Sequence, residues 1–424
     1  MWRIPKGRFT RDVGTRFLVQ GVGLCISLVT GAVTARWLGQ EGKGLLSLTT
    51  LLPSFMGLFL GAGLMSANVY FIGSGRFGIR ALTANSILVT IATTFIGFAI
   101  VALLIVTGAI ERIVPNCPVE LILVGFCMLP FGVLAAHLGS ILQGLRCIKT
   151  LGVISIVQQT VALGLIVFLV AYMNLGVLGA LVAGVAASLL SIALNTTAVL
   201  KEGGTLRPHF DLAVIKATLA YGIRGHVGNL LQYFNYRLDV FIVNFFMGPA
   251  EVGIYGVAVT MAEVLWFLPD AVGFVIFPKS AGTSTREMNT FTPRVFKYVL
   301  AFTAFSAAVL AIAAKPLIPL VFSKAFNASY MPMLALLPGV VLLGGAKVLT
   351  NEIAGRGHPG YNSLNAGVCL VITVIADLLL IPRHGAIGAA AASSIAYAST
   401  FFIALCCYRI ISRRQVIAHA KEIQ

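Results

Sequence analysis

The chain alternates long apolar stretches with short polar segments along its whole length. Each stretch has roughly the 20 residues that a helix needs to cross the core of a bilayer. The pattern predicts twelve such spans, at residues 13–35, 45–71, 82–108, 119–142, 151–173, 177–200, 222–246, 252–278, 296–314, 330–350, 362–381 and 386–409. We therefore expect an all-α integral membrane protein.

The composition supports this expectation. Hydrophobic residues make up 58% of the 424 residues, charged residues only 10%, and the mean hydropathy is +0.95. Soluble domains carry about 25% charged residues, so this chain has too few charges to cover a surface that faces water. Membrane lipids are the expected surroundings of most of its surface.

The charge distribution predicts the orientation. The net charge is +16, which by itself could indicate a nucleic-acid partner. With a cytoplasmic N-terminus, however, the inner segments and inner span ends hold 22 Lys and Arg residues and the outer segments hold 6. The remaining two, Arg224 and Arg237, lie within a span. Because cytoplasmic segments of membrane proteins are enriched in Lys and Arg, this distribution favours cytoplasmic N- and C-termini and argues against nucleic acid.

Small residues recur between the two halves of the chain at a shift of 209 positions. The matched pairs are Gly39 and Gly248, Gly44 and Gly253, Gly176 and Gly385, Gly179 and Gly388, and Ala180 and Ala389. They fall in equivalent turns between predicted spans. The recurrence predicts an internal repeat of six helices.

The repeat predicts the organisation of the chain. An N-terminal lobe is expected at 1–200, a cytoplasmic linker at 201–221 and a C-terminal lobe at 222–424. Six helices return the chain to its starting side, so the two repeats should run parallel around a central cavity. Such an arrangement is typical of transport by alternating access.

Motifs for catalysis or nucleotide binding are absent from the sequence. Gly39 to Gly44 has the glycine spacing of a phosphate-binding loop, but Leu45 and Leu46 stand where Lys and Ser or Thr would follow. The six histidines lack the spacing of metal ligands. We expect neither an enzyme nor a cofactor nor a bound metal, and any coupling should use an ion such as H⁺ or Na⁺.

The span at 222–246 is the most polar. At about 100° per residue, one stripe of this helix collects polar side chains, and further polar residues flank it. The stripe holds Asn229, Gln232, Tyr236 and Asp239, and the flank holds Asn235 and Arg224. Since a polar stripe is costly in lipid, we expect it to line a wet cavity that binds substrate.

The two arginines of this span have two interpretations each. Arg224 either extends to the cytoplasmic interface or captures an anionic substrate. Arg237, deeper in the span, either binds that substrate or forms a structural ion pair with Asp239 or Glu263.

Buried acids are the candidates for ion coupling. Glu263 lies at mid-depth of its span, Asp239 at a similar depth on the preceding one, and Asp377 about a turn from a span end. Polar residues within the spans of the first half include Arg16, Asn68, Asn85, His137, Gln158, Gln159 and Asn195. Arg16 and His137 lie near inner span ends, so we expect both at the membrane interface.

Three segments carry a resemblance to a known family. They are Ala35-Arg-Trp-Leu-Gly39-Gln-Glu-Gly-Lys-Gly44-Leu-Leu-Ser, Arg237-Leu-Asp239 followed by Gly248-Pro-Ala-Glu251-Val-Gly253-Ile-Tyr255, and Leu380-Ile-Pro382-Arg-His-Gly385-Ala-Ile-Gly388. They resemble the polysaccharide-transporter branch of the multidrug/oligosaccharidyl-lipid/polysaccharide exporter superfamily, the Wzx-type flippases. Asp377 departs from this pattern, in which Asn is usual.

The resemblance implies a flippase of the bacterial inner membrane. Its substrate would be an oligosaccharide on polyprenyl pyrophosphate, moved from the cytoplasmic to the periplasmic leaflet for surface polysaccharide biosynthesis. A polymerase and other glycan-assembly proteins are possible partners. The alternative within the superfamily is a cation-coupled multidrug exporter, for which a more acidic or aromatic cavity is expected. A membrane-embedded polymerase or acyltransferase is disfavoured because the outer loops are short.

Overall fold

The computed structural model describes the backbone of residues 6–283 and 285–422, and their side chains except at 6–16, 224–225, 278, 281–282, 285–286 and 413–422. Within these residues, every regular element is helical. The helices are α1 (Lys6–Leu60), α2 (Leu64–Ser74), α3 (Ile79–Val106), α4 (Ala109–Ile113), α5 (Val119–Phe126), α6 (Met128–Gly144), α7 (Ile148–Ile166), η1 (Val167–Tyr172), α8 (Gly176–Lys201), α9 (Leu212–Met247), α10 (Pro249–Glu263), η2 (Val264–Trp266), α11 (Phe267–Gly282), α12 (Thr285–Val321), η3 (Lys324–Ser329), α13 (Tyr330–Gly355) and α14 (Pro359–Glu422).

The fold class expected from the sequence, an all-α membrane protein, is confirmed. Nine helical segments among the described residues are long and apolar enough to cross a membrane. Large apolar side chains lie on the surface, with Phe95 75% exposed and Ile312 79% exposed. Exposed apolar area on this scale requires an apolar solvent, so these side chains contact lipid.

Three features account for the difference between these nine segments and the twelve predicted spans. The helical run of α1 continues through Gly39 (φ 69°, ψ −171°), and that of α14 continues through Gly385 (φ 54°, ψ −133°). Each run is two helices that meet at a kink. The predicted span 222–246 falls in α9, whose apolar part, Leu212–Ile223, is too short to cross a membrane. The continuity of the span expected at 45–71 was predicted wrongly, because this span breaks between α1 and α2 at residues 61–63.

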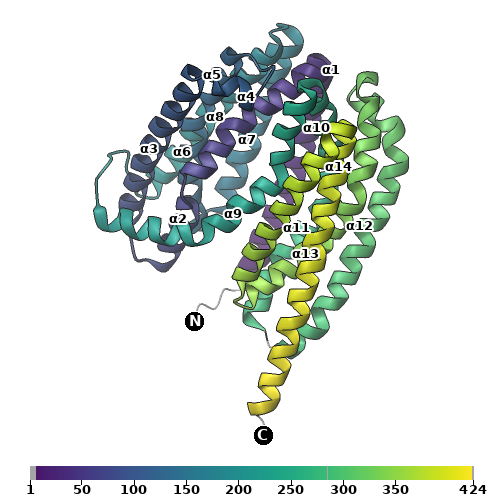
Figure 1. Cartoon of the computed structure of the whole chain (residues 1–424). Helices are drawn as coiled ribbons and strands as arrows, with labels where there is room; N and C mark the ends of the chain where they lie inside the picture. Colours follow the sequence, from purple (N-terminus) through teal and green to yellow (C-terminus); the bar gives the residue numbers. More distant parts are fainter. Residues whose placement is uncertain (1–5, 284, 423–424) are drawn as a thin grey trace. The chain divides into compact units, whose positions relative to one another are not determined.

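Two compact units make up the chain, Met1–Val227 and Gly228–Gln424, and the division falls inside α9. In the N-terminal unit α6 packs against α2, α3 and α8, and α7 packs against α1 and α8. In the C-terminal unit α13 packs against α10, α11, α12 and α14. Figure 1 shows the long helices of each unit running side by side.

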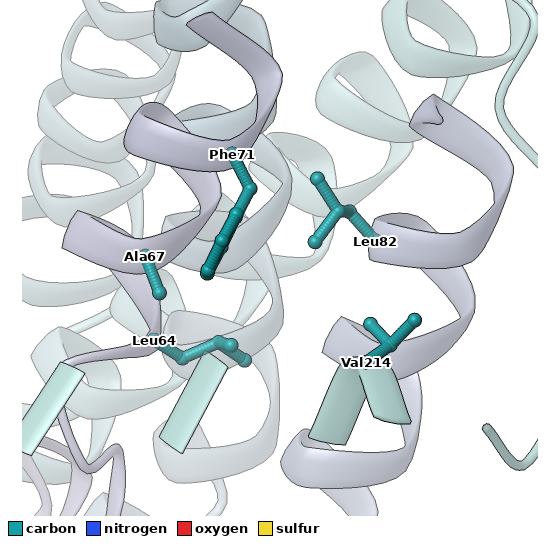
Figure 2. Close-up of a cluster of buried hydrophobic side chains, with 5 residues drawn as sticks. All are labelled: Leu64, Ala67, Phe71, Leu82 and Val214. Atoms are coloured by element: carbon teal, nitrogen blue, oxygen red, sulfur yellow. The ribbon is translucent and has the colours of Figure 1, made fainter. Parts of the chain in front are cut away.

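A buried apolar cluster joins α2, α3 and the start of α9 in the N-terminal unit. Figure 2 shows its members, Leu64, Ala67 and Phe71 of α2, Leu82 of α3 and Val214 of α9. All five are at most 2% exposed. The first part of α9 is thereby fixed to the helices that precede it.

The α1–α2 connection approaches α9 through backbone contact. Gly63 has φ 72°, a left-handed conformation that glycine adopts without strain. A β-carbon on Gly222 of α9 would lie 2.4 Å from the carbonyl oxygen of Ala62 and 2.9 Å from the carbonyl carbon of Gly63. The two segments can pack at this distance only because Gly222 has no side chain.

We expect Gly222→Ala to destabilise the protein by roughly 1–3 kcal/mol, the cost of overpacking a tight contact. Alanine is intrinsically better than glycine in a helix by about 1 kcal/mol, so a decrease in the free energy of unfolding would have to come from the tight contact. Gly164→Ala in α7, where a β-carbon would meet no atom within 4 Å, is the control and should be neutral or stabilising. Thermal unfolding in detergent checks both, and a Gly222→Ala protein as stable as the control would contradict the contact.

A buried ion pair connects four helices at one end of the C-terminal unit. Arg356 pairs with Glu352 one turn earlier on α13, and the two side chains are 4% and 0% exposed. Arg356 also donates to Asn289 Oδ1 of α12 at 2.8 Å and to Ser412 Oγ of α14 at 3.4 Å. Ser280 of α11 donates to the Glu352 carbonyl oxygen at 3.3 Å. We call these five residues the α13 clasp.

Candidate functional site

The second half of α9 carries most of the residues expected to bind substrate. Asn229 is exposed, Gln232 and Tyr236 are partly buried, and Asp239 is buried at 2% exposure. The predicted polar stripe therefore runs from an accessible end to a buried end. Arg224 belongs to the same helix, and its side chain lies outside the described residues.

Asn235 fixes α9 to α14. Its amide nitrogen donates to the carbonyl oxygen of Ala366 at 2.9 Å, and its amide oxygen accepts from Thr373 Oγ1 at 3.1 Å. The side chain is 5% exposed. Both ends of this amide are thus used by the protein itself, which points to a positioning role.

Arg237 and Glu263 form a two-pronged ion pair between α9 and α10. The guanidinium Nη1 lies 3.0 Å from Glu263 Oε1, and Nη2 lies 3.2 Å from Oε2. The side chains are 33% and 24% exposed, so a ligand can reach the pair. Of the two partners expected from the sequence, the structure selects Glu263.

Aromatic rings flank this ion pair. The Tyr236 ring centroid lies 5.4 Å from that of Trp266 and 6.0 Å from that of Tyr397. Lys347 Nζ lies 4.3 Å from the Trp266 ring centroid and 2.7 Å from Asp270 Oδ1. The C-terminal unit thus places cations, acids and ring faces within one neighbourhood.

Asp239 accepts hydrogen bonds from three sides. Tyr255 Oη of α10 donates to its carboxylate, Ser393 Oγ of α14 donates at 3.2 Å, and the backbone N–H of Val240 donates at 2.8 Å. Hydrogen bonds of this kind stabilise a carboxylate out of water. Asp239 is therefore built into the junction of α9, α10 and α14.

Asp377, unlike Asp239, is a buried acid whose carboxyl group accepts no hydrogen bond from the described residues. It is 0% exposed, and neither of its carboxyl oxygens has a hydrogen-bond partner among the residues that the structure describes. Thr373, one turn earlier on α14, bonds Asn235, one turn before Asp239. Asp377 and Ser393 lie on opposite sides of the Gly385 kink of α14, at equal distances along the chain. Ser393 is the residue that donates to Asp239. These two hydrogen bonds hold the stretch of α14 around Asp377 next to the stretch of α9 that carries Asp239.

Sequence reasoning missed several residues of this neighbourhood. Tyr255 and Ser393 contact Asp239 from 16 and 154 residues away, and neither is ionised near neutral pH, so a search for charges in spans passes over them. His137 was placed wrongly at an interface: it is 2% exposed, with Nδ1 3.0 Å from Thr90 Oγ1. Across the described residues, no group of three or more His, Cys, Asp or Glu side chains could hold a metal ion.

The chain matches the family described as polysaccharide biosynthesis protein over residues 33–331. It belongs to that family. The resemblance seen in the turn motifs is thereby confirmed, and the chain is also similar to archaeal membrane proteins. It is 26% identical to the probable low-salt glycan biosynthesis flippase Agl15 of Haloferax volcanii over 45% of this chain, a match that spans only 41% of that relative. It is 23% identical to the uncharacterized membrane protein MJ1375 of Methanocaldococcus jannaschii over 88% of this chain and 91% of that protein.

Solved structures show the same fold. The lipid II flippase MurJ in an inward closed conformation matches with a TM-score of 0.76 at 15% identity, over 94% of this chain and 90% of that one. An inward-facing multidrug resistance MATE family transporter of the MOP superfamily matches with a TM-score of 0.71 at 14% identity, over 92% and 95%. This member of the polysaccharide biosynthesis family therefore has the fold of MOP-superfamily transporters.

Proposed function

We propose that this protein is a flippase that moves a polyprenyl-pyrophosphate-linked oligosaccharide from the cytoplasmic to the outer leaflet by alternating access, for surface polysaccharide biosynthesis. The family match and the relative named a glycan biosynthesis flippase support this function. The observation that carries it is Arg237, a cation one third exposed within the predicted span 222–246. A lipid-linked pyrophosphate needs such a group, because its desolvation would otherwise prevent crossing.

The proposed architecture is twelve helices in two parallel six-helix repeats. Matched glycines of the two halves share backbone conformations. Gly39 (φ 69°, ψ −171°) corresponds to Gly248 (φ 87°, ψ 177°), and Gly176 (φ 57°) corresponds to Gly385 (φ 54°). Contacts correspond as well, at the same shift of 209 residues. A β-carbon at Gly42 would lie 3.3 Å from Val177 Cγ2, and the equivalent pair is Glu251 Oε1 and Ala386 N, 2.9 Å apart.

Arg237 and Glu263 would exchange partners during a cycle. In the empty protein Glu263 neutralises the guanidinium, which avoids an unpaired charge in a low-dielectric region. A pyrophosphate can also place two oxygens against the planar guanidinium of Arg237, and it carries more negative charge than the Glu263 carboxylate. It would therefore displace that carboxylate. Asn229, Gln232 and Tyr236 are then placed to contact the sugar next to the head group, and Arg224 would meet the head group at the cytoplasmic surface.

Asp239 and Asp377 are the proposed coupling pair, with Glu263 acting through Arg237. Two carboxylates held near one another in a buried site are stable only if a cation lies between them or if one of them takes up a proton. Asp377 has unused oxygens for that ion, and Asp239 is held in place by Tyr255 and Ser393. Either H⁺ or Na⁺ would serve.

The orientation, with both termini in the cytoplasm of the cell, follows from the distribution of Lys and Arg. The outer-leaflet product would pass to a polymerase or other glycan-assembly proteins.

A cation-coupled multidrug exporter is the second candidate, favoured by the fold shared with the MATE transporter. It is the weaker candidate because the accessible ion pair contains the Arg237 guanidinium, a cation that would repel a cationic drug.

Flipping of a fluorescent polyprenyl pyrophosphate disaccharide in proteoliposomes tests the proposal. Arg237→Ala should lower the rate roughly a hundredfold, since a desolvated charge-assisted pair is lost, and Arg237→Lys should restore it only in part. Arg383→Ala removes an exposed arginine of the same unit and should leave the rate unchanged. Two results would count against the proposal: export of a cationic dye without lipid flipping, or full flipping by an Arg237→Ala, Glu263→Gln double variant.

A further inference from the structure

A cavity lined by both polar and apolar residues lies within the N-terminal unit. It has a volume of about 280 Å³ and lies among α6, α7 and α8. Five hydrogen-bonding side chains line it: Ser155 and Gln158 of α7, and Ser188, Ser191 and Asn195 of α8. The opposite wall, on α6, is bare and apolar, formed by Gly132, Ala135, Ala136 and Gly139.

Asn195 is the residue that points to a ligand in this cavity. The residue is 4% exposed, and its amide nitrogen donates to the Ser191 carbonyl oxygen at 2.8 Å. Its amide oxygen is buried and has no hydrogen-bond partner among the described residues. That oxygen lies 3.6 Å from the position of a β-carbon on Gly139, a residue of the bare wall, so it points across the cavity. An unsatisfied buried acceptor destabilises a protein by about 1–3 kcal/mol, and a donor from a ligand would remove this cost.

The lining selects a class of ligand. All the residues that line the cavity are uncharged, so a phosphate or a cationic drug would lose its hydration there without a counter-charge. The volume is many times the roughly 30 Å³ that one water occupies, which leaves room for a ring. One polar wall and one flat apolar wall match a pyranose, whose hydroxyl groups lie around its edge and whose C–H groups form its faces.

The cavity lies deep within the spans. Gln158 is ten residues after the start of α7, or about 15 Å at 1.5 Å per residue. Asn195 is six residues before the end of α8. Polar side chains at such depth mark a substrate path rather than a lipid-facing groove. In the proposed topology this half of the helices faces the cytoplasm, where the glycan would be loaded.

We propose that the α6–α7–α8 cavity is a sugar-binding subsite that holds one uncharged monosaccharide unit of the transported glycan. This inference rests on the proposed flippase function and extends it to the other unit of the chain. Gln158, Ser188, Ser191 and Asn195 bind the hydroxyl groups, and the α6 wall packs against the ring. The residues of this cavity therefore recognise a sugar unit other than the one next to the head group.

Gly132→Leu tests the subsite by filling it, because a β-carbon at Gly132 would meet no atom within 4 Å. Gln158→Leu keeps the size of the side chain and removes its hydrogen bonds. Gly164→Leu on α7, which also has open space at its β-carbon and does not line the cavity, is the matched control. Two probes are compared in proteoliposomes: a fluorescent polyprenyl pyrophosphate that carries a disaccharide, and the same lipid without sugar.

Both cavity variants should flip the sugar-bearing probe roughly tenfold more slowly, as expected for the loss of one or two hydrogen bonds, and flip the sugar-free probe at the control rate. Equal rates for all variants would mean that the cavity holds only water, and a parallel loss with both probes would mean a structural role. Either result overturns the subsite.

A binding measurement keeps the subsite testable if flipping itself is not observed. The methyl glycosides of glucose, galactose and N-acetylglucosamine are titrated against the purified protein in detergent. At least one should raise the unfolding temperature of the wild type saturably and should fail to do so with Gly132→Leu. Absence of flipping with intact sugar binding would reject the flippase function alone, whereas absence of any shift in the wild type would reject the subsite.

Discussion

Asp377→Asn is expected to abolish the dependence of transport on an ion gradient while leaving thermal stability unchanged or higher. The carboxyl group is fully buried and makes no hydrogen bond to the residues that the structure describes. An unpaired buried charge destabilises the protein, so a neutral side chain of the same shape removes that cost. Loss of function combined with retained stability is the signature of a group kept for an ion.

Asp239→Asn provides the matched comparison. Asp239 accepts from Tyr255, Ser393 and the Val240 N–H, and an amide would place donors against these donors. We expect a loss of about 1.5–3 kcal/mol, the usual contribution of a hydrogen bond to a charged group, together with loss of coupling. Transport driven by imposed H⁺ or Na⁺ gradients and unfolding in detergent measure the two effects. Ion-driven transport at the wild-type rate in Asp377→Asn would end the coupling proposal.

Glu352→Ala should cause the largest loss of stability, about 3–5 kcal/mol, because it leaves Arg356 charged and buried. Arg356 is held by the α13 clasp at 4% exposure, so water cannot replace the lost carboxylate. A double variant, Glu352→Leu with Arg356→Met, removes both charges and should recover most of the stability, as buried pairs replaced by apolar residues often do.

The control for this prediction is an accessible ion pair of the same unit. Lys279 and Glu287 lie 4.0 Å apart with side chains 34% and 61% exposed. Glu287→Ala should therefore change stability by less than about 1 kcal/mol. Unfolding midpoints of the four proteins in one detergent check the series. A loss in Glu352→Ala no greater than that in Glu287→Ala would show that the clasp is solvated.

The sequence predicted the membrane-spanning helices well because span length is imposed by the bilayer. It failed where the backbone bends inside an apolar stretch. Residues 61–63 break a predicted span, and glycines of this kind are also common within unbroken membrane helices. Composition alone cannot separate these two uses of glycine.

The sequence could narrow the partners of a side chain but could not choose between them. Arg237 was expected to pair with either Asp239 or Glu263. Two residues apart on one helix, Arg237 and Asp239 project in different directions, which explains why the structure pairs Arg237 with Glu263. The contacts of Asp239 with Tyr255 and Ser393 depend on how α9, α10 and α14 pack. No local pattern in the sequence carries that information, and the cavity around Asn195 escaped prediction for the same reason.

The kinks at Gly39 and Gly385 also shorten the exposed connection between the two helices that meet at each of them. In the N-terminal unit Gly42 contacts Val177, and in the C-terminal unit Glu251 binds the backbone of Ala386. The chain reverses there through single left-handed glycines instead of loops. Proteases cleave exposed, flexible loop tips, and these turns offer almost none. The irregular segment between α8 and α9, residues 202–211, is a far better substrate. We therefore expect a protease to cut at residues 202–211 before it cuts at Gly39 or Gly385.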